Sequence, residues 1–197
     1  MTRIKALASL AKDFHFVADI GCDHGLVLYE LLKLNKDVKC LAVDNKKGPL
    51  DSARKLLSSY QNVSFSLSNG IENLPENVDC VIVAGLGGST IKAIFENHDF
   101  SKISRFIINP SKNPEIVRLF LTKNGLKIVS EEVIYEKGTY YQIIVFERGK
   151  GELTELETKY GPVLLKNRSE MFLKMYRDLI KRLPEFKAIK IREELKI

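Results

Sequence analysis

The sequence predicts an α/β fold in which a mostly parallel sheet is followed by a small helical segment. Two observations support this fold class. Over residues 1–150, short and almost wholly apolar runs alternate with segments of helical apolar spacing, as expected for strands buried on both faces. Over residues 151–197 no such run occurs, and apolar residues recur at intervals of three and four.

Each expected element has its own local signal. Residues 4–10 are amphipathic and predict a helix, and the apolar run 16–20 predicts a strand that ends at Gly21. Similar apolar runs predict strands over 38–43, 63–67, 78–84 and 103–108. The segments between them predict helices over 24–34, 48–59, 89–96 and 115–123. Gly48-Pro49 suits a helix start, and Gly125 suits the residue after a helix end.

The last two strands are expected to be antiparallel. Residues 127–135 and 140–147 are strand-like, and the four residues 136–139 between them, which include Gly138, are typical of a hairpin turn. A parallel sheet with helices on both faces and an antiparallel pair at one edge follows from this order.

The character of the chain changes after Gly149-Lys150-Gly151, which predicts two domains, 1–150 and 151–197. In the second, the apolar stripes predict a coiled-coil-like hairpin of helices, and a short basic helix follows Pro184. This domain holds 11 basic and 8 acidic residues, a net charge of +3 over 47 residues, while the whole chain carries +6. A basic domain favours a polyanionic partner. A solvated helical surface rich in lysine and glutamate is the alternative.

Composition excludes several classes of protein. With 45% hydrophobic and 28% charged residues, the chain is globular, and no apolar run approaches the length of a membrane span. The N-terminal residues lack the pattern of a secretory leader. The three cysteines are odd in number and lack metal-ligand spacing, which predicts a reduced, cytoplasmic protein without a metal site. No large apolar stripe is left over, so we expect a monomer.

Small or hydrogen-bonding residues follow every parallel strand. In an open parallel sheet, ligands bind beyond these carboxyl ends. The first strand is followed by Gly21 and Asp23, and the second ends at Asp44-Asn45. The later strands lead into Asn69-Gly70, Ala84 to Gly88, and Asn109-Pro110.

Gly21 and Asp44 together favour a nucleoside-containing cofactor. Gly21 lets a ligand approach the backbone, and Asp44 stands where a carboxylate would accept hydrogen bonds from ribose hydroxyls. A solvated aspartate is the alternative for Asp44. The dinucleotide pattern lacks its second glycine, and Asp23 would repel a pyrophosphate. S-adenosylmethionine, which carries a sulfonium and an amino acid group, tolerates such acidic neighbours.

Three segments in order resemble the bacterial tRNA (adenine-N1)-methyltransferases that modify adenine 22 in the D-arm. They are Asp19-Ile20-Gly21-Cys22-Asp23-His24, Ala84-Gly85-Leu86-Gly87-Gly88 and Asn109-Pro110. Arg3-Ile4, Tyr140-Tyr141 and Tyr160-Gly161-Pro162 extend the resemblance over nearly the whole chain. It implies a Rossmann-like class I methyltransferase fold, S-adenosylmethionine as cofactor and tRNA as partner. Two departures from the family pattern are Asn69 in place of an aspartate and the loss of a tyrosine after His24.

The resemblance also implies roles for individual residues. Asp23 is the expected catalytic residue, and its alternative is an N-cap for the helix that follows. The residues expected to bind the cofactor are Arg3, Asp19, Gly21, Asp44, Asn45, Asn69, Gly70, Ala84 and Gly85. Those expected to contact the adenine are Gly87, Gly88, Asn109 and Pro110. For Gly87-Gly88 a tight turn into a helix is the alternative, and His24 is expected to be a structural hydrogen-bonding residue.

A basic surface is expected to bind the RNA. Its candidate residues are Arg3, Lys5, Lys166, Arg168, Lys174, Arg177, Lys181 and Arg182. Two rival functions stay open: a class I methyltransferase that acts on another nucleic acid or a protein, and a non-catalytic RNA-binding protein with a degenerate pocket.

Overall fold

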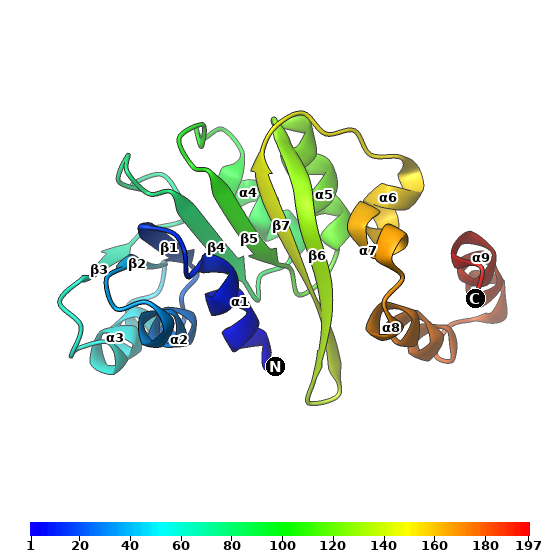
Figure 1. Ribbon diagram of the computed structural model, residues 1–197, viewed down its shortest axis with the longest axis horizontal. Helices are drawn as coiled ribbons and strands as arrows, with labels where there is room; N and C mark the ends of the chain where they lie inside the picture. The colour runs from blue at the N-terminus through cyan, green and yellow to red at the C-terminus, as the bar shows by residue number, and fades with distance from the viewer.

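The computed structural model describes all of residues 1–197 and contains one seven-stranded sheet (Figure 1). The strand order is β3-β2-β1-β4-β5-β7-β6, and β1 to β5 are parallel. β7 runs antiparallel to both β5 and β6, as predicted. The strands are β1 Phe16–Ile20, β2 Lys39–Asp44, β3 Val63–Leu67, β4 Cys80–Ala84, β5 Arg105–Asn109, β6 Leu126–Glu136 and β7 Thr139–Arg148.

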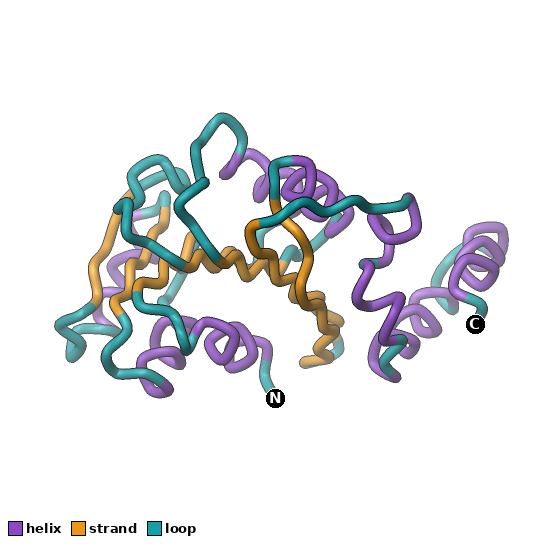
Figure 2. Tube along the Cα trace, turned by 45° about the horizontal axis from the view of Figure 1, so that its top comes forward, coloured by secondary structure: helices purple, strands orange, loops and turns teal.

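Helices cover both faces of the sheet (Figure 2). α1, α2 and α3 lie on one face, and α4 and α5 lie on the other. They span α1 Arg3–Ala11, α2 Leu26–Leu34, α3 Lys47–Leu56, α4 Gly88–Phe95 and α5 Pro114–Lys123. Alternate strand residues therefore enter different apolar clusters: Val17 packs with the α1–α3 face, and Ala18 with the α4–α5 face. This double burial explains why the strands are almost wholly apolar.

The C-terminal segment contains four helices, where the sequence predicted a coiled-coil-like hairpin. They are α6 Glu155–Tyr160, α7 Pro162–Asn167, α8 Glu170–Ile180 and α9 Glu185–Leu195. Gly161, at φ +96°, separates α6 from α7, and Arg168, at φ +45°, separates α7 from α8. Even α8 and α9 have only 11 residues each, about three turns, which is short for heptad packing.

These helices have an apolar cluster of their own, built around Phe172, Tyr160 and Leu195. Val133 of β6 belongs to the same cluster, so the helices pack directly on the edge of the sheet. No helix of the structure combines the length and the apolar character that crossing a bilayer requires.

A buried ion pair fixes the contact between the sheet and the C-terminal helices. Arg118 of α5 and Glu131 of β6 are both fully buried, with 2.7 Å between Nε and Oε1. Arg118 also donates to the carbonyls of Thr158 and Lys159 at the end of α6. Glu131 accepts the N–H of Val163 at the start of α7. Each charge thus lies at the helix end whose dipole it complements.

Candidate functional site

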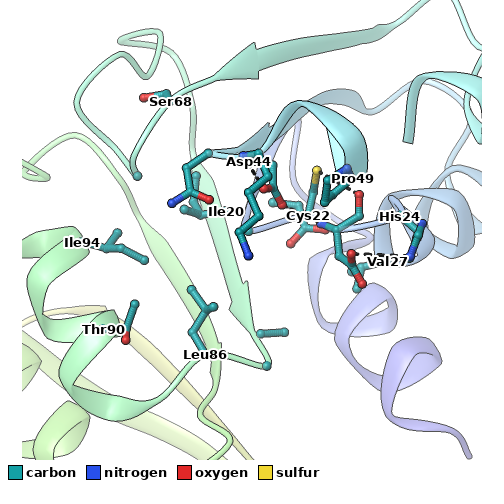
Figure 3. Close-up of a pocket in the computed structure, with 18 of the residues that line it drawn as sticks. Ile20, Cys22, His24, Val27, Asp44, Pro49, Ser68, Leu86, Thr90 and Ile94 are labelled. Carbon is teal, nitrogen blue, oxygen red and sulfur yellow. Dashed lines mark hydrogen bonds and ion pairs between the residues drawn. The ribbon is translucent and has the colours of Figure 1, made fainter. Parts of the chain in front are cut away.

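A cavity of about 530 Å³ opens at the carboxyl ends of the parallel strands, where the strand order switches between β1 and β4. All nine residues predicted to bind a cofactor line it, and so does Asp23. Figure 3 shows Leu86, Thr90 and Ile94 on one side of the cavity and Cys22 and Val27 on the other. Convergence of the strand ends therefore brings the predicted residues together.

The turn after β1 is tight and is held by the neighbouring strand. The N–H groups of Gly21 and Cys22 both donate to the carbonyl of Val43, at 2.8 and 2.9 Å. Gly21 has φ +73° and Gly25 has φ +74°, a conformation that favours glycine. A Cβ at Gly25 would also lie 3.0 Å from Ala53 of α3. The backbone consequently forms an open floor for the cavity.

Asp23 lies at the mouth of the cavity and does not cap a helix. α2 begins at Leu26, and its N-cap is Gly25, without a side-chain hydrogen bond. The alternative interpretation of Asp23 as an N-cap is therefore wrong. Its side chain is 69% exposed, and its backbone, at φ +50°, is held by a 3.0 Å hydrogen bond from its N–H to Asp44 Oδ2. The carboxylate is thus presented toward the solvent side of the cavity.

His24 has a different environment from the one predicted. Its ring is 60% exposed, and its one polar partner is Asp23, with 3.6 Å between Nε2 and Oδ1. An exposed histidine with no other side-chain hydrogen bond does not stabilise the fold, so the prediction of a structural role is wrong.

Asp44 is held rigidly at the end of β2. It is 8% exposed, and its two carboxylate oxygens accept the N–H groups of Asp23 and Lys46, at 3.0 and 2.9 Å. A carboxylate oxygen accepts more than one hydrogen bond. Asp44 therefore retains acceptor capacity toward the cavity, as recognition of a diol requires.

Asp19 is a buried carboxylate without a hydrogen-bond donor from the protein. It is 2% exposed on β1 and lines the cavity. Burial raises its pKa from 3.8 to about 7; the nearby charges of Asp44 and Asp23 add to this rise, and Arg3 opposes it. A cation bound in the cavity would restore the ionised form.

Arg3 is tied to three elements at the edge of the cavity. Its Nη1 donates to Asn109 Oδ1 at 3.0 Å, and its guanidinium lies 4.8 Å from the centre of the Tyr141 ring. Its backbone N–H donates to Glu136 at 3.2 Å. The N-terminal turn of α1 is thereby fastened to β5 and to the β6–β7 hairpin, and the arginine has no carboxylate side chain as an ion-pair partner.

None of the four residues predicted to contact the adenine lines this cavity. Asn109 is fully buried, and both ends of its amide are occupied by Arg3 and the Gln142 carbonyl. Pro110 is buried beside it. Gly88 is buried under the loop after β5, where a Cβ would come within 2.2 Å of the Asn113 carbonyl. Gly87 caps α4, so the pair forms the tight turn into a helix that was the alternative.

One wall of the cavity was not predicted from the sequence. Thr90, Ala93 and Ile94 of α4 line it. Ala93 and Ile94 follow Thr90 by three and four residues, which places all three on one helix face. This pattern could have indicated the wall, because Gly85 at the cavity lies shortly before this helix. Leu86 and Ile94 give the wall an apolar surface suited to a planar ring.

Comparison with known proteins defines the class first. Residues 1–144 match the family model described as a methyltransferase domain, so the chain is a methyltransferase of this fold. A protein of Mycoplasma genitalium, provisionally named a tRNA methyltransferase, is 33% identical over 98% of this chain and 94% of its own length. The tRNA (adenine(22)-N(1))-methyltransferase of Bacillus subtilis is 26% identical over 88% of this chain and 78% of its own.

A solved structure extends the comparison. The Streptococcus pneumoniae protein Sp1610, provisionally named a tRNA (m1A22) methyltransferase and crystallised with S-adenosyl-L-methionine, is 26% identical. It superposes with a TM-score of 0.89 over 98% of this chain and 96% of that one. The chain therefore belongs to the bacterial tRNA (adenine22-N1)-methyltransferase family.

Proposed function

We infer that this chain transfers a methyl group from S-adenosylmethionine to N1 of adenine 22 in tRNA. The observation that carries this inference is the cavity itself, in which Asp19, Asp44 and Arg3 converge at the strand ends of a chain that belongs to this family. We also propose that the chain acts in the cytoplasm, since tRNA is a cytoplasmic substrate. We further propose that it is a monomer. Light scattering would test the oligomeric state.

The donor and acceptor groups of the cavity fit this cofactor. Asp44 would accept hydrogen bonds from the two ribose hydroxyls. Asp19, which lacks a protein partner, would accept the ammonium group, and Arg3 would donate to the carboxylate. Asn69, Gly70 and Ile94 would surround the adenine ring. When bound, S-adenosylmethionine supplies a methyl group that its sulfonium activates.

Asp23 is the residue that we propose acts on the substrate base. The ring nitrogen N1 already carries a lone pair, so much of the rate enhancement is expected from positioning. The exposed Asp23 carboxylate at the cavity mouth would accept a hydrogen bond from the exocyclic amino group. This contact would raise the electron density at N1 and stabilise the positive charge that develops on the ring. Adenine 22 would have to leave its stack to reach the cavity.

The RNA surface that we propose uses the cations that have neither an ion pair nor a side-chain hydrogen bond. Of the candidates on the C-terminal helices, Arg177 and Lys181 pair with Glu170 and Asp178, and Arg168 donates to the Leu195 carbonyl. The candidates with neither an ion pair nor a side-chain hydrogen bond are Lys166, Lys174 and Arg182. Replacing these three with alanine should weaken tRNA binding and reduce its dependence on salt.

Incubation with labelled S-adenosylmethionine and unmodified tRNA, followed by nucleoside analysis, tests the function. We expect 1-methyladenosine, and we expect none when adenine 22 is replaced by guanine. Asp23→Ala should abolish turnover and retain cofactor binding. The matched control Asp37→Ala, an exposed acid near the opposite edge of the sheet, should behave as wild type. Cofactor binding without any methylated tRNA would point to another substrate, and no cofactor binding would favour the degenerate pocket.

A further inference from the structure

The side chain of Asn109 is a fully buried bridge between two chain segments. Its Nδ2 donates to the carbonyl of Gln142 at 2.8 Å, and its Oδ1 accepts from Arg3 Nη1 at 3.0 Å. The orientation of the amide follows from its neighbours, because a carbonyl only accepts and a guanidinium only donates. Asn109 thus meets each neighbour with the complementary group.

The position of Asn109 at the end of β5 explains why an amide is needed there. The pairing of β5 with β7 ends at Ile108 opposite Ile144. Beyond this point the Gln142 carbonyl has no backbone donor from β5, and the Asn109 side chain supplies one. An aspartate would place an oxygen against that carbonyl, and an alanine would leave it without a partner.

Arg3 is the residue that this bridge positions. Its guanidinium lines the cavity and lies beside Gly85, where a Cβ would be 4.0 Å from Nη1. Asn109 Oδ1 accepts from one N–H donor of the guanidinium, and the Tyr141 ring covers one of its faces. No carboxylate side chain forms an ion pair with Arg3. Arginine has five donors, so several stay available for an anionic group in the cavity.

We propose that Asn109 is a positioning residue that orients Arg3 toward the carboxylate of the cofactor's amino acid group. This proposal rests on the proposed function, because it takes S-adenosylmethionine as the ligand. A flexible arginine loses less freedom on binding when it is already oriented. Removal of Asn109 should therefore weaken the binding of ligands that carry the amino acid group and spare ligands that lack it.

Two probes separate this role from a general loss of structure. S-adenosylhomocysteine carries the amino acid group, and 5′-methylthioadenosine has the same nucleoside and sulfur without it. By titration calorimetry, Asn109→Ala should lower the affinity for S-adenosylhomocysteine by about tenfold, the equivalent of one hydrogen bond. Its affinity for 5′-methylthioadenosine should stay within about twofold of wild type, because Arg3 does not touch that ligand. Equal losses for both probes would overturn the proposal.

A double-mutant cycle tests whether Asn109 acts through Arg3. Arg3→Met should lower the affinity for S-adenosylhomocysteine, and adding Asn109→Ala should lower it no further. Additive losses would contradict the proposal. The control is Asn62→Ala, since Asn62 also bridges backbone carbonyls, of Lys36 and Val38, but lies at the opposite edge of the sheet. Failure of wild type to bind either probe would refute the proposed function itself.

Discussion

Replacement of Asp19 by asparagine should stabilise the free protein while weakening its cofactor binding. Asp19 is 2% exposed and receives no hydrogen bond from the protein, and its pKa is raised from 3.8 to about 7. Burial is the main cause, the charges of Asp44 and Asp23 contribute, and Arg3 partly compensates. The ionised form of Asp19 therefore lowers the stability of the folded protein. Asparagine has a similar shape but no charge, so it avoids this loss.

The size of this cost follows from the pKa difference between the folded and unfolded states. Because the folded pKa is the higher one, folding is penalised as pH rises from 3.8 toward 7 and stays penalised above it. At ~1.4 kcal/mol per pH unit, the full penalty is about 4 kcal/mol at pH 8. At pH 5 the folded form is still protonated, and the penalty is about 2 kcal/mol.

Urea unfolding of both proteins at pH 5 and pH 8 measures this difference. We expect Asp19→Asn to be more stable than wild type at both values, and the gain to grow by about 2–3 kcal/mol between them. The exposed Asp37→Asn control should show no such growth. A gain that is equal at both pH values, or a loss of stability, would refute the reasoning. Affinity for S-adenosylmethionine should fall in Asp19→Asn, because the acceptor for the ammonium loses its charge.

Three further predictions concern the fold and the cofactor. Gly161→Ala should lower the free energy of unfolding, measured in urea, by about 5 kcal/mol, because a Cβ would lie 2.5 Å from the Glu131 carboxylate of the buried ion pair. Gly138 has a similar positive φ but lies in open space, so Gly138→Ala should lower it by only about 1–2 kcal/mol. Similar costs for the two would contradict the assigned clash. Asp44→Asn should weaken S-adenosylmethionine binding by at least about tenfold in a calorimetric titration, since an amide cannot replace both charged acceptors; an unchanged affinity would remove Asp44 from the site. Cofactor at about 100 times its Kd should raise the unfolding free energy by ~2.7 kcal/mol, and no rise would indicate that the pocket does not bind it.

The sheet was predictable because its signals are local. β1 and β3 were expected over 16–20 and 63–67, and the structure has the same bounds. The hairpin of β6 and β7 was also expected, and in the structure each strand extends one residue further at both ends. Strands buried on both faces carry a continuous apolar run, and such a run is visible without knowledge of the fold.

That the residues expected to bind the cofactor meet at one cavity was predictable for a geometric reason. The carboxyl ends of parallel strands lie along the same side of the sheet. Residues that follow different strands, such as Gly21, Asp44 and Gly85, therefore meet at one cavity. The wall contributed by Thr90 and Ile94 was missed, because a residue on a helix face carries no mark of what that face covers.

The C-terminal helices show where local signals were present and misread. Gly161-Pro162 marks both the end of α6 and the start of α7, and Ser169 caps α8 through its side chain. The apolar residues of all four helices pack into one cluster. Periodicity alone therefore indicated a hairpin of helices and did not show how many helices share this cluster.

By itself, the sequence determined the order of strands and helices, the edge of the sheet that carries the site, and the acidic character of that site. Only the tertiary structure decided that Asn109 faces Arg3 across 106 residues of sequence, and that Arg118 and Glu131 join the sheet to the C-terminal helices. The physical reason is the range of the interactions. Burial and backbone preference act on neighbours in the chain, whereas a buried polar side chain takes its role from a partner that the fold brings to it.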